Sequence, residues 1–505
     1  MNNPFNLIDE KWIPCQRLDG STTEYSLIDL LTKAHETRTL VHDLPMEKVS
    51  LFRVLLAILH RNFGPASQAV WQKLWQENRF DEKKLKTYFS EWHHRFNLFD
   101  EKYPFYQTTD ISVEIRPLNG YSFHLAVFHI ASGNNATLFD HHTEEDEIIF
   151  SSAEAARLLI NAQSFAFGFR SFKDGPSARG INFVARGKNL FETLMMNMIL
   201  YNKHNPFHVL KEDMPTWERY NAFTPDRTKP DGYLDYLTWQ CRKVLMHVEG
   251  DGAFVNRIQV DNGLKLDVNG EPYTKNPMMQ YSKVESLAGG GAPFRPLKFQ
   301  EGKALWRDST SILEINSSDT EAPAVVKWLS ECRLNQSTVR MNSIGISSDQ
   351  GKVNFYLEEL FTFPKKYLEN DRLLAQLKTC LTQAEEVRNK LWGSVNRMAE
   401  IVLSSDADRE EGRKADKKDK QQLIDHIFAE YQYWSQLETP FYQLLNDLSE
   451  KDFKAMGDWQ HVVRGSAWHA FEFARDFIGN SPNALKAGAL GGCVLGSGLN
   501  KVFED

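Results

Sequence analysis

Glycines alternate with cationic residues between residues 168 and 187 of this chain. The run begins with Gly168-Phe169-Arg170-Ser171, and its later members are Lys173, Gly175, Arg179, Gly180, Arg186 and Gly187. Glycine lets a backbone approach a ligand closely, and Lys and Arg place positive charge beside phosphate, so the pattern indicates contact with nucleic acid. A P-loop is excluded because no Gly-Lys-Ser or Gly-Lys-Thr ends the run. A glycine turn on a basic surface without a ligand remains the alternative.

Two polar segments are less specific when they are taken alone. Residues 132–141 are small, polar and turn-prone, and they include Asn134, Asn135, Phe139 and His141. A surface loop that merely connects two elements explains this composition as well as a binding loop does. The second segment, Arg333-Leu334-Asn335-Gln336-Ser337, carries an Asn-Gln pair that is ordinary for a surface turn.

The sequence contains no catalytic constellation. The cluster that most resembles a metal site is His141, His142, Glu144, Glu145 and Asp146, and His93-His94 is a second pair. Adjacent side chains on a helix or strand point apart, and helical zinc pairs need a four-residue spacing. His42-Asp43 lacks the remote partners of an HD nuclease, and no serine-hydrolase, Walker or paired-carboxylate signature occurs. We therefore predict a protein that is not an enzyme and that uses no cofactor and no metal.

Five phrases of sequence point to one family. They are Phe5-Asn6-Leu7-Ile8-Asp9-Glu10-Lys11-Trp12-Ile13-Pro14, Asn97-Leu98-Phe99-Asp100-Glu101-Lys102-Tyr103-Pro104-Phe105-Tyr106-Gln107, Phe183-Val184-Ala185-Arg186-Gly187, Pro215-Thr216-Trp217 and Tyr236-Leu237-Thr238-Trp239-Gln240-Cys241-Arg242. In this order and spacing they resemble the large subunit of type I-E Cascade, the CasA family of CRISPR surveillance complexes. The resemblance runs to about residue 340, and a helical tail of fitting length follows.

The resemblance implies roles for the polar segments. The loop with Phe139 and His141 corresponds to one that lies against the end of the CRISPR RNA (crRNA) and the protospacer-adjacent motif (PAM). The glycine run corresponds to a loop that touches the PAM minor groove; relatives have more glycines where Arg170 and Ser171 stand, so either an arginine makes this contact or the loop is displaced. Gln336 corresponds to the tip of a wedge that parts the first target base pair, flanked by Asn335 and Ser337 with Arg333 near phosphate. Such wedges replace one stacking step at a cost of a few kcal/mol.

Lys265 corresponds most nearly to a lysine that completes the family's PAM contacts. We expect it on a strand between Gly263 and Gly270, and a solvated lysine on an alternating strand explains it equally well. The minor groove offers mainly an A·T-versus-G·C distinction, so a protein that reads a PAM there should accept several trinucleotides.

Length and composition constrain the class of protein. A chain of 505 residues should form two or more domains. Its net charge of -8 opposes nucleic-acid binding on average, but a subunit of a ribonucleoprotein needs only a local basic surface. We expect the five scattered cysteines to be reduced and buried, with no structural zinc. No apolar run approaches the roughly 20 residues of a membrane span and no signal peptide is evident, so we expect a cytoplasmic protein.

The periodicity predicts an α+β fold. Residues 1–365 should form a large, irregular mixed domain that carries PAM recognition and complex docking, with helices near 49–60 and 153–162 and a strand near 111–115. Residues 366–505 should form a C-terminal four-helix bundle.

Four segments should supply the helices of this bundle. One apolar stripe runs from Leu374 to Val402, and a second runs from Leu423 to Leu448, where Pro440 should kink or break it. Residues 404–420 between them are almost entirely charged or small and should be a solvated connector, with a specific phosphate-binding role as the alternative. Residues 459–478 and 483–503 supply the other two helices. The last is weakened by glycines that cost roughly 1 kcal/mol each in a helix interior, namely Gly488, Gly491, Gly492, Gly496 and Gly498.

These observations predict a Cascade large subunit that recognises the PAM in duplex DNA, initiates strand separation and R-loop formation, and helps to recruit a helicase-nuclease. Its partners would be the other Cascade subunits, crRNA, double-stranded target DNA with its displaced strand, and the helicase-nuclease in trans, with no membrane. Candidates for holding the displaced strand are Arg388, Arg397, Arg464, Arg475 and Lys486, although a solvated helix face explains each equally well. The alternatives are an assembly subunit that does not touch DNA and a metal-dependent hydrolase that uses the His141 cluster.

Overall fold

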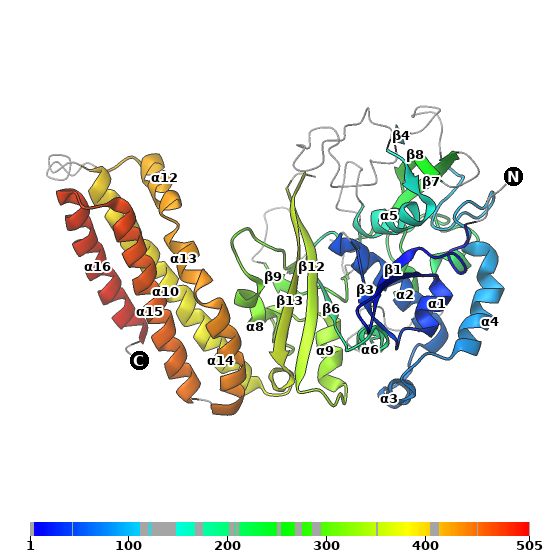
Figure 1. Cartoon of the computed structure of the whole chain (residues 1–505), viewed down its shortest axis with the longest axis horizontal. Coiled ribbons are helices and arrows are strands. Elements are labelled where there is room, and N and C mark those ends of the chain that lie inside the picture. The colour runs from blue at the N-terminus through cyan, green and yellow to red at the C-terminus, as the bar shows by residue number, and fades with distance from the viewer. Residues whose placement is uncertain are drawn as a thin grey trace. The chain divides into compact units, whose positions relative to one another are not determined.

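The computed structural model describes residues 5–42, 44–111, 121–122, 148–166, 175–200, 207, 212–249, 254–267, 275–284, 294–349, 352–404, 414–451 and 453–503. The chain divides into two compact units. The first contains residues 1–300 and 314–362, and the second contains residues 301–313 and 363–505. The first unit mixes helices and strands, and the second is helical in its described part, which confirms the expected fold class (Figure 1).

Small antiparallel sheets organise the first unit. The first has the order β2-β1-β3 and comprises β1 (Ile13–Arg17), β2 (Thr22–Tyr25) and β3 (Thr37–Leu40). In the second, β8 (Phe254–Asn262) pairs with β4 (Tyr121–Ser122), β5 (Phe150–Ser151) and β7 (Arg242–Glu249). The third has the order β10-β9-β11 and comprises β9 (Tyr281–Lys283), β10 (Phe294–Pro296) and β11 (Thr320–Glu321). The fourth has the order β13-β12-β6 and comprises β6 (Asn182–Ala185), β12 (Thr338–Asp349) and β13 (Lys352–Pro364).

Helices connect these strands. They are α1 (Leu27–Thr32), α2 (Pro45–Phe63), α3 (Gln68–Glu77), α4 (Glu82–Trp92), α5 (Ser152–Phe165), α6 (Leu190–Asn197), α7 (Tyr233–Leu237) and α9 (Ala324–Glu331), with short 3-10 turns at His93–Arg95 and Thr216–Glu218. Helices α2 and α5 confirm the two helices that periodicity predicted. Local sequence sets their starts: Pro45 opens α2, and Ser151 with Glu154 forms a capping box at α5. The strand predicted near 111–115 lies outside the described residues apart from Ile111.

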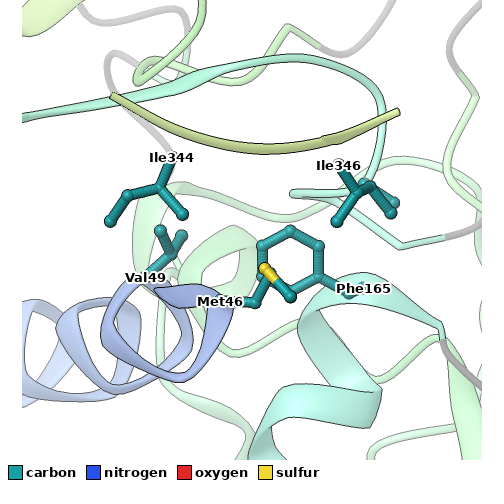
Figure 2. Close-up of a cluster of buried hydrophobic side chains, with 6 residues drawn as sticks. Met46, Val49, Phe165, Ile344 and Ile346 are labelled. Atoms are coloured by element: carbon teal, nitrogen blue, oxygen red, sulfur yellow. The ribbon is translucent and has the colours of Figure 1, made fainter. Parts of the chain in front are cut away.

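Two of these helices pack against the fourth sheet. Met46 and Val49 of α2, Phe165 at the end of α5, and Ile344 and Ile346 of β12 form one buried cluster. Figure 2 shows the Met46 and Phe165 side chains side by side beneath the strand that carries the two isoleucines. Each of the five side chains is at most 2% exposed, so β12 is fixed to the centre of the unit. That strand leads directly to the candidate site.

The second unit is built from long helices. They are α10 (Asp371–Leu403), α12 (Lys417–Ile427), α13 (Ala429–Ser435), α14 (Glu438–Lys451), α15 (Phe453–Ile478) and α16 (Pro482–Phe503), preceded by α8 (Ser309–Leu313) and short 3-10 turns at Leu305–Asp308 and Lys365–Leu368. Helix α10 contacts α15 and α16, and α15 also contacts α13 and α14. If α12, α13 and α14 are counted as one interrupted helix, these helices form the expected four-helix bundle (Figure 1).

The second stripe breaks, but not at Pro440. Phe428 adopts a left-handed conformation with φ of 53° and separates α12 from α13, and α14 begins at Glu438. Pro440 therefore lies in the first turn of α14, where its missing N–H leaves no intrahelical bond unmade. The prediction of a break was right, and its position was wrong. Lys417–Lys420 of the expected connector belong to α12.

The glycine-rich C-terminal segment is a continuous helix because its glycines face close neighbours. A Cβ added at Gly491 would lie 2.5 Å from Cγ of Met398, and one at Gly488 would lie 3.0 Å from Cγ of Arg475. The Ser394 hydroxyl donates to the Gly491 carbonyl at 2.7 Å, which joins α10 to α16 directly. Close approach of these neighbouring side chains to the α16 backbone thus offsets the propensity cost of glycine.

Two further features bear on the sequence predictions. Cys15, Cys241, Cys332 and Cys380 are buried as expected, whereas Cys493 is exposed, because it lies on the outer face of α16. Among the described residues, no helix combines the length and the apolar character needed to cross a bilayer.

Candidate nucleic-acid interface

The Gln336 turn, residues 332–337, joins α9 to β12. Its apolar members point inward: Cys332 is 1% exposed and Leu334 is 8% exposed. Its polar members lie at the surface, with Arg333, Asn335 and Ser337 exposed and Gln336 half-buried. The alternation of buried and exposed positions presents the predicted wedge residues to solvent on a turn that is itself held by the core.

Helix α3 supports this turn. Trp71 of α3 is fully buried and packs edge-on against Trp328 of α9, with ring centroids 5.4 Å apart, while its indole N–H donates to the Met195 carbonyl at 2.9 Å. The Gln68 amide donates to the Glu331 carbonyl, and the Gln72 amide donates to the Arg333 carbonyl at 3.4 Å. The backbone on the α9 side of Gln336 is therefore fixed by another helix.

A hydrogen bond to Glu192 tethers the Gln336 side chain. Its Nε2 donates to Oε2 of Glu192 at 3.3 Å, and the same oxygen accepts a 2.8 Å hydrogen bond from the backbone N–H of Lys188. Glu192 lies in the first turn of α6, which Asn189 caps. Because the Gln336 bond is long, its loss would cost little, so the side chain is free to take a new partner.

Two arginines face each other beside the turn. Strands β6 and β12 pair antiparallel with Ala185 opposite Met341, and one step on, the Arg186 N–H donates to the Arg340 carbonyl at 2.8 Å. Opposite residues of an antiparallel pair project to the same side, where like charges repel. Within the described part of the chain, no side-chain hydrogen bond or ion pair engages Arg186, Arg340 or the neighbouring Arg333. An anion between these guanidinium groups would relieve the repulsion and accept their N–H donors.

The glycine run has a structural explanation in its described part. A Cβ at Gly175 would lie 2.5 Å from the Phe165 carbonyl carbon, and one at Gly180 would lie 2.7 Å from the Leu297 carbonyl oxygen. A Cβ at Gly187 would collide with Glu192. These three glycines are thus required by close packing within the unit. Residues Gly168, Phe169, Arg170 and Ser171 lie outside the described residues, as do Asn134, Asn135, Phe139 and His141.

Lys265 is exposed, but it does not lie on a strand. Strand β8 ends at Asn262, and the following loop bonds to the segment before β7: the Gly263 N–H donates to the Cys241 carbonyl and the Leu264 N–H to the Gln240 carbonyl. The expected strand at 263–270 was therefore wrong over 263–267, because these residues run beside an incoming segment and not beside another strand. Lys265 shares no described hydrogen bond or ion pair with the Gln336 turn.

The histidine pairs serve structural roles where they are described. His93 contacts the Asp9 carboxylate at 2.7 Å, and His42 contacts the Glu47 carboxylate at 3.1 Å. No group of three His, Cys, Asp or Glu residues in the described ranges is placed to hold a metal ion. The cluster from His141 to Asp146 falls outside those ranges.

Most bundle candidates are already engaged by neighbours. Arg388 pairs with Glu430 at 2.8 Å, Arg475 pairs with Glu472 at 3.0 Å, and Arg464 donates to the Asn500 side chain at 3.2 Å. Arg397 is exposed and makes no described ion pair. Lys486 is exposed on α16.

The sequence prediction overlooked the residues that build the Gln336 turn. Arg340, Glu192 and the α3 residues that anchor it come from three separate parts of the chain, so their meeting is a tertiary property. The signal for Arg340 was present, because an exposed arginine alternates with buried Val339 and Met341 immediately after Gln336. No comparable signal pointed to Glu192 or Trp71.

Known proteins resemble this chain along almost its whole length. A family model described as CRISPR-associated protein Cse1 matches residues 6–470. The curated CRISPR-associated protein CasA/Cse1 of Thermus thermophilus is 30% identical over 520 residues, covering 99% of this chain and 98% of the relative. A crystal structure of Thermus thermophilus CasA superimposes with a TM-score of 0.79 at 26% identity, covering 98% of this chain and 99% of that one. A chain of a structure named CRISPR RNA-guided surveillance complex has the same fold, with a TM-score of 0.76 at 19% identity and 99% coverage of both chains.

Proposed function

The chain belongs to the CRISPR-associated Cse1 (CasA) family, the large subunit of type I-E Cascade, and from this premise we propose that it recognises the PAM in duplex DNA and starts strand separation there. In this proposal the other Cascade subunits and the crRNA are its partners in the cytoplasm. The crRNA then pairs with the opened target strand to form an R-loop, and the completed complex recruits the helicase-nuclease that cuts the DNA. The large subunit itself performs no catalysis.

The Gln336 turn is the observation that carries this proposal. A wedge must stay rigid while it replaces a stacking step that costs a few kcal/mol, and this turn is held by buried Leu334 and by α3. A wedge tip must also be free to leave its resting contact, and among the described residues the Gln336 side chain makes one long bond, to Glu192. The guanidinium groups of Arg186 and Arg340, together with that of Arg333 in the turn, would hold the phosphates of the duplex while Gln336 and Asn335 enter the stack.

Residues outside the described ranges complete the proposal. Phe139 would stack on a base or ribose at the crRNA end, with Asn134, Asn135 and His141 beside it, and stacking of this kind contributes roughly 1–3 kcal/mol. Gly168, Phe169, Arg170 and Ser171 would touch the PAM minor groove together with Lys265. Readout from this groove should be permissive, since it distinguishes mainly A·T from G·C pairs.

The test compares fully paired DNA with DNA already open beside the PAM. In assembled complexes, Gln336→Ala with Asn335→Ala should slow R-loop formation on the fully paired target, because the barrier to opening the first pairs rises. The same variant should behave almost as wild type on the pre-opened target, where the unstacking cost has been removed beforehand. R-loop formation is followed by the fluorescence of a base analogue next to the PAM.

A matched control is Gln76→Ala, which removes an exposed glutamine of α3 outside the turn and should leave both rates unchanged. Equal defects of the double variant on the two targets would rule out a wedge and leave only a positioning contact. Wild-type rates on both targets would favour the assembly subunit that does not touch DNA.

A further inference from the structure

A small hollow in the first unit lies apart from the Gln336 turn. It has a volume of about 240 Å³ and is bordered by residues 102–110, 216–217 and 220–223, by Arg95 and by Gln240. Three of the five sequence phrases that identify the family, those around Tyr103, Trp217 and Gln240, meet at its walls. Pockets for drug-sized ligands usually span about 300–1,000 Å³, so this one suits a group no larger than a single base with part of its sugar.

Aromatic rings form the wall and the rim of the hollow. Phe105 and Trp217 are buried, with ring centroids 6.0 Å apart and nearly parallel. At the rim, Tyr103 and Tyr220 meet edge-on with centroids 6.1 Å apart. Tyr220 is 81% exposed, which is a high exposure for a large aromatic side chain beside a pocket. An exposed ring in this position offers a free face for stacking.

Two cations stand at the same rim. The Arg95 guanidinium carbon lies 4.4 Å from the Tyr103 ring centroid, and Arg95 also donates to the Arg219 carbonyl at 2.7 Å. The Lys102 ammonium lies 5.0 Å from the same ring. Neither forms an ion pair with a described carboxylate. Asp100 acts electrostatically on Arg95, but no described ion pair occupies either cation, so both keep N–H donors that a phosphate could accept.

A buried amide at the hollow is incompletely satisfied. Gln240 is only 4% exposed, and its Oε1 has no hydrogen-bond partner among the described residues. Leaving a buried acceptor unpaired costs roughly 1–3 kcal/mol, and a ligand N–H would recover this energy. The residue is held in place through its backbone carbonyl, which accepts from the Leu264 N–H at 3.0 Å.

We propose that this pocket binds one unpaired nucleotide of single-stranded RNA or DNA. The base stacks on the exposed face of Tyr220, its exocyclic amino group donates to Gln240 Oε1, and its phosphate lies at Arg95 and Lys102. The requirement for an amino donor selects cytosine or adenine over uracil. The proposal does not rest on the role of the Gln336 turn.

The test uses the purified full-length chain and fluorescein-labelled oligonucleotides that differ in one base type. Cytosine and uracil present opposite hydrogen-bonding groups at the exocyclic position, an amino donor and a carbonyl acceptor, so we compare oligo-C with oligo-U by fluorescence anisotropy, in both the RNA and the DNA series. Oligo-C should bind roughly two- to tenfold more tightly than oligo-U, the range expected for one hydrogen bond. Tyr220→Ala should weaken oligo-C binding roughly five- to hundredfold. Gln240→Met should abolish the preference for C.

The control is Tyr431→Ala, which removes a tyrosine of the second unit that is 64% exposed and should leave binding unchanged. Tighter binding of either sugar series supports the proposal and identifies whether RNA or DNA is the source of the nucleotide. Equal or reversed affinities for C and U in the wild type overturn it, and so does a Tyr220→Ala variant that binds as well as Tyr431→Ala. Both of these readouts remain decisive if Gln240→Met fails to fold.

Discussion

Removing the facing arginines beside the Gln336 turn should weaken DNA binding without weakening the fold. Arg186 and Arg340 oppose each other across β6 and β12, and neither side chain has a described partner. In the free protein their repulsion is a small cost, and on DNA the same two charges would neutralise phosphate. Arg186→Gln with Arg340→Gln removes both effects and keeps a polar side chain at each position.

The magnitudes follow from the number of charges. Each phosphate contact contributes about -0.9 to the slope of log K against log salt concentration, so two contacts contribute about -1.8. Between 50 and 200 mM salt, a fourfold change, the wild type should therefore lose roughly twelvefold more affinity than the double variant. The free chain should gain about 0.2–1 kcal/mol of stability, because a like-charge cross-strand pair is removed.

Two measurements on the same variant test this reasoning. Binding of the assembled complex to a PAM-containing duplex is measured by gel shift across the salt series, and unfolding of the subunit alone is measured with urea. Lys11→Gln with Arg79→Gln removes the same charge from exposed sites of the same unit and should leave the salt slope unchanged. A double variant with the wild-type slope would refute the phosphate contact, and a clear loss of stability would show that the arginines serve the fold.

Three further predictions concern the subunit alone. Burial lowers the pKa of His60 to about 3, so below pH 6.5 the unfolded chain takes up a proton that the folded chain excludes. In urea unfolding, the loss of stability between pH 7.5 and pH 5 should therefore be about 2 kcal/mol smaller in His60→Phe than in the wild type. In thermal unfolding, Gly465→Ala should stabilise the chain by up to about 1 kcal/mol, because the added Cβ has no atom within 4 Å. Gly491→Ala should instead destabilise the chain by about 1–3 kcal/mol, because its Cβ meets Met398. A Gly491→Ala variant more stable than the wild type would contradict the close packing of α16. Burial raises the pKa of Cys15 and Cys380 to about 12 and Cys493 is exposed, so mass spectrometry should find one alkylated cysteine in the native chain and five after denaturation.

The sequence predicted the elements whose signal is local. The apolar stripe from Leu374 to Val402 predicted α10, and apolar residues at helical spacing predicted α2 and α5. These predictions succeeded because the buried face of an amphipathic helix repeats every three or four residues along the sequence. The break near Pro440 was misplaced because Phe428 gives no such signal: a left-handed phenylalanine is held by its surroundings. The glycines of α16 made the last helix look weak, because helix propensity penalises glycine. Only the packed structure shows that neighbouring side chains leave little room for a Cβ at Gly488 and Gly491.

Only one part of the candidate site, the turn at residues 332–337, could be predicted from the sequence, because a single segment supplies it. The turn with Asn335 and Gln336 was found, but its support by Trp71 and Glu192 joins residues more than a hundred positions away, and no periodicity encodes that meeting. The glycine run is a second case. In the sequence, a ligand contact and a glycine turn without a ligand both explained it. In the structure, Gly175, Gly180 and Gly187 each pack against a neighbouring backbone or side chain, which favours the structural explanation for these three.

The charge balance explains why the uncompensated arginines at the Gln336 turn are informative. The chain has 67 acidic and 59 basic residues, so acidic partners are in surplus. Under that surplus, the paired Arg186 and Arg340 and the exposed Arg333 of the turn, none with a described acid partner, are best explained by an anion that the free chain does not supply. The net charge of -8 also repels DNA at long range, so under the proposed function the long-range attraction of DNA would have to come from the other components of the complex. A subunit of this kind would contribute little to the rate at which the complex encounters DNA. Its effect would come after the complex has bound the duplex, when the local basic surface and the rigid Gln336 turn would decide whether the first base pairs open.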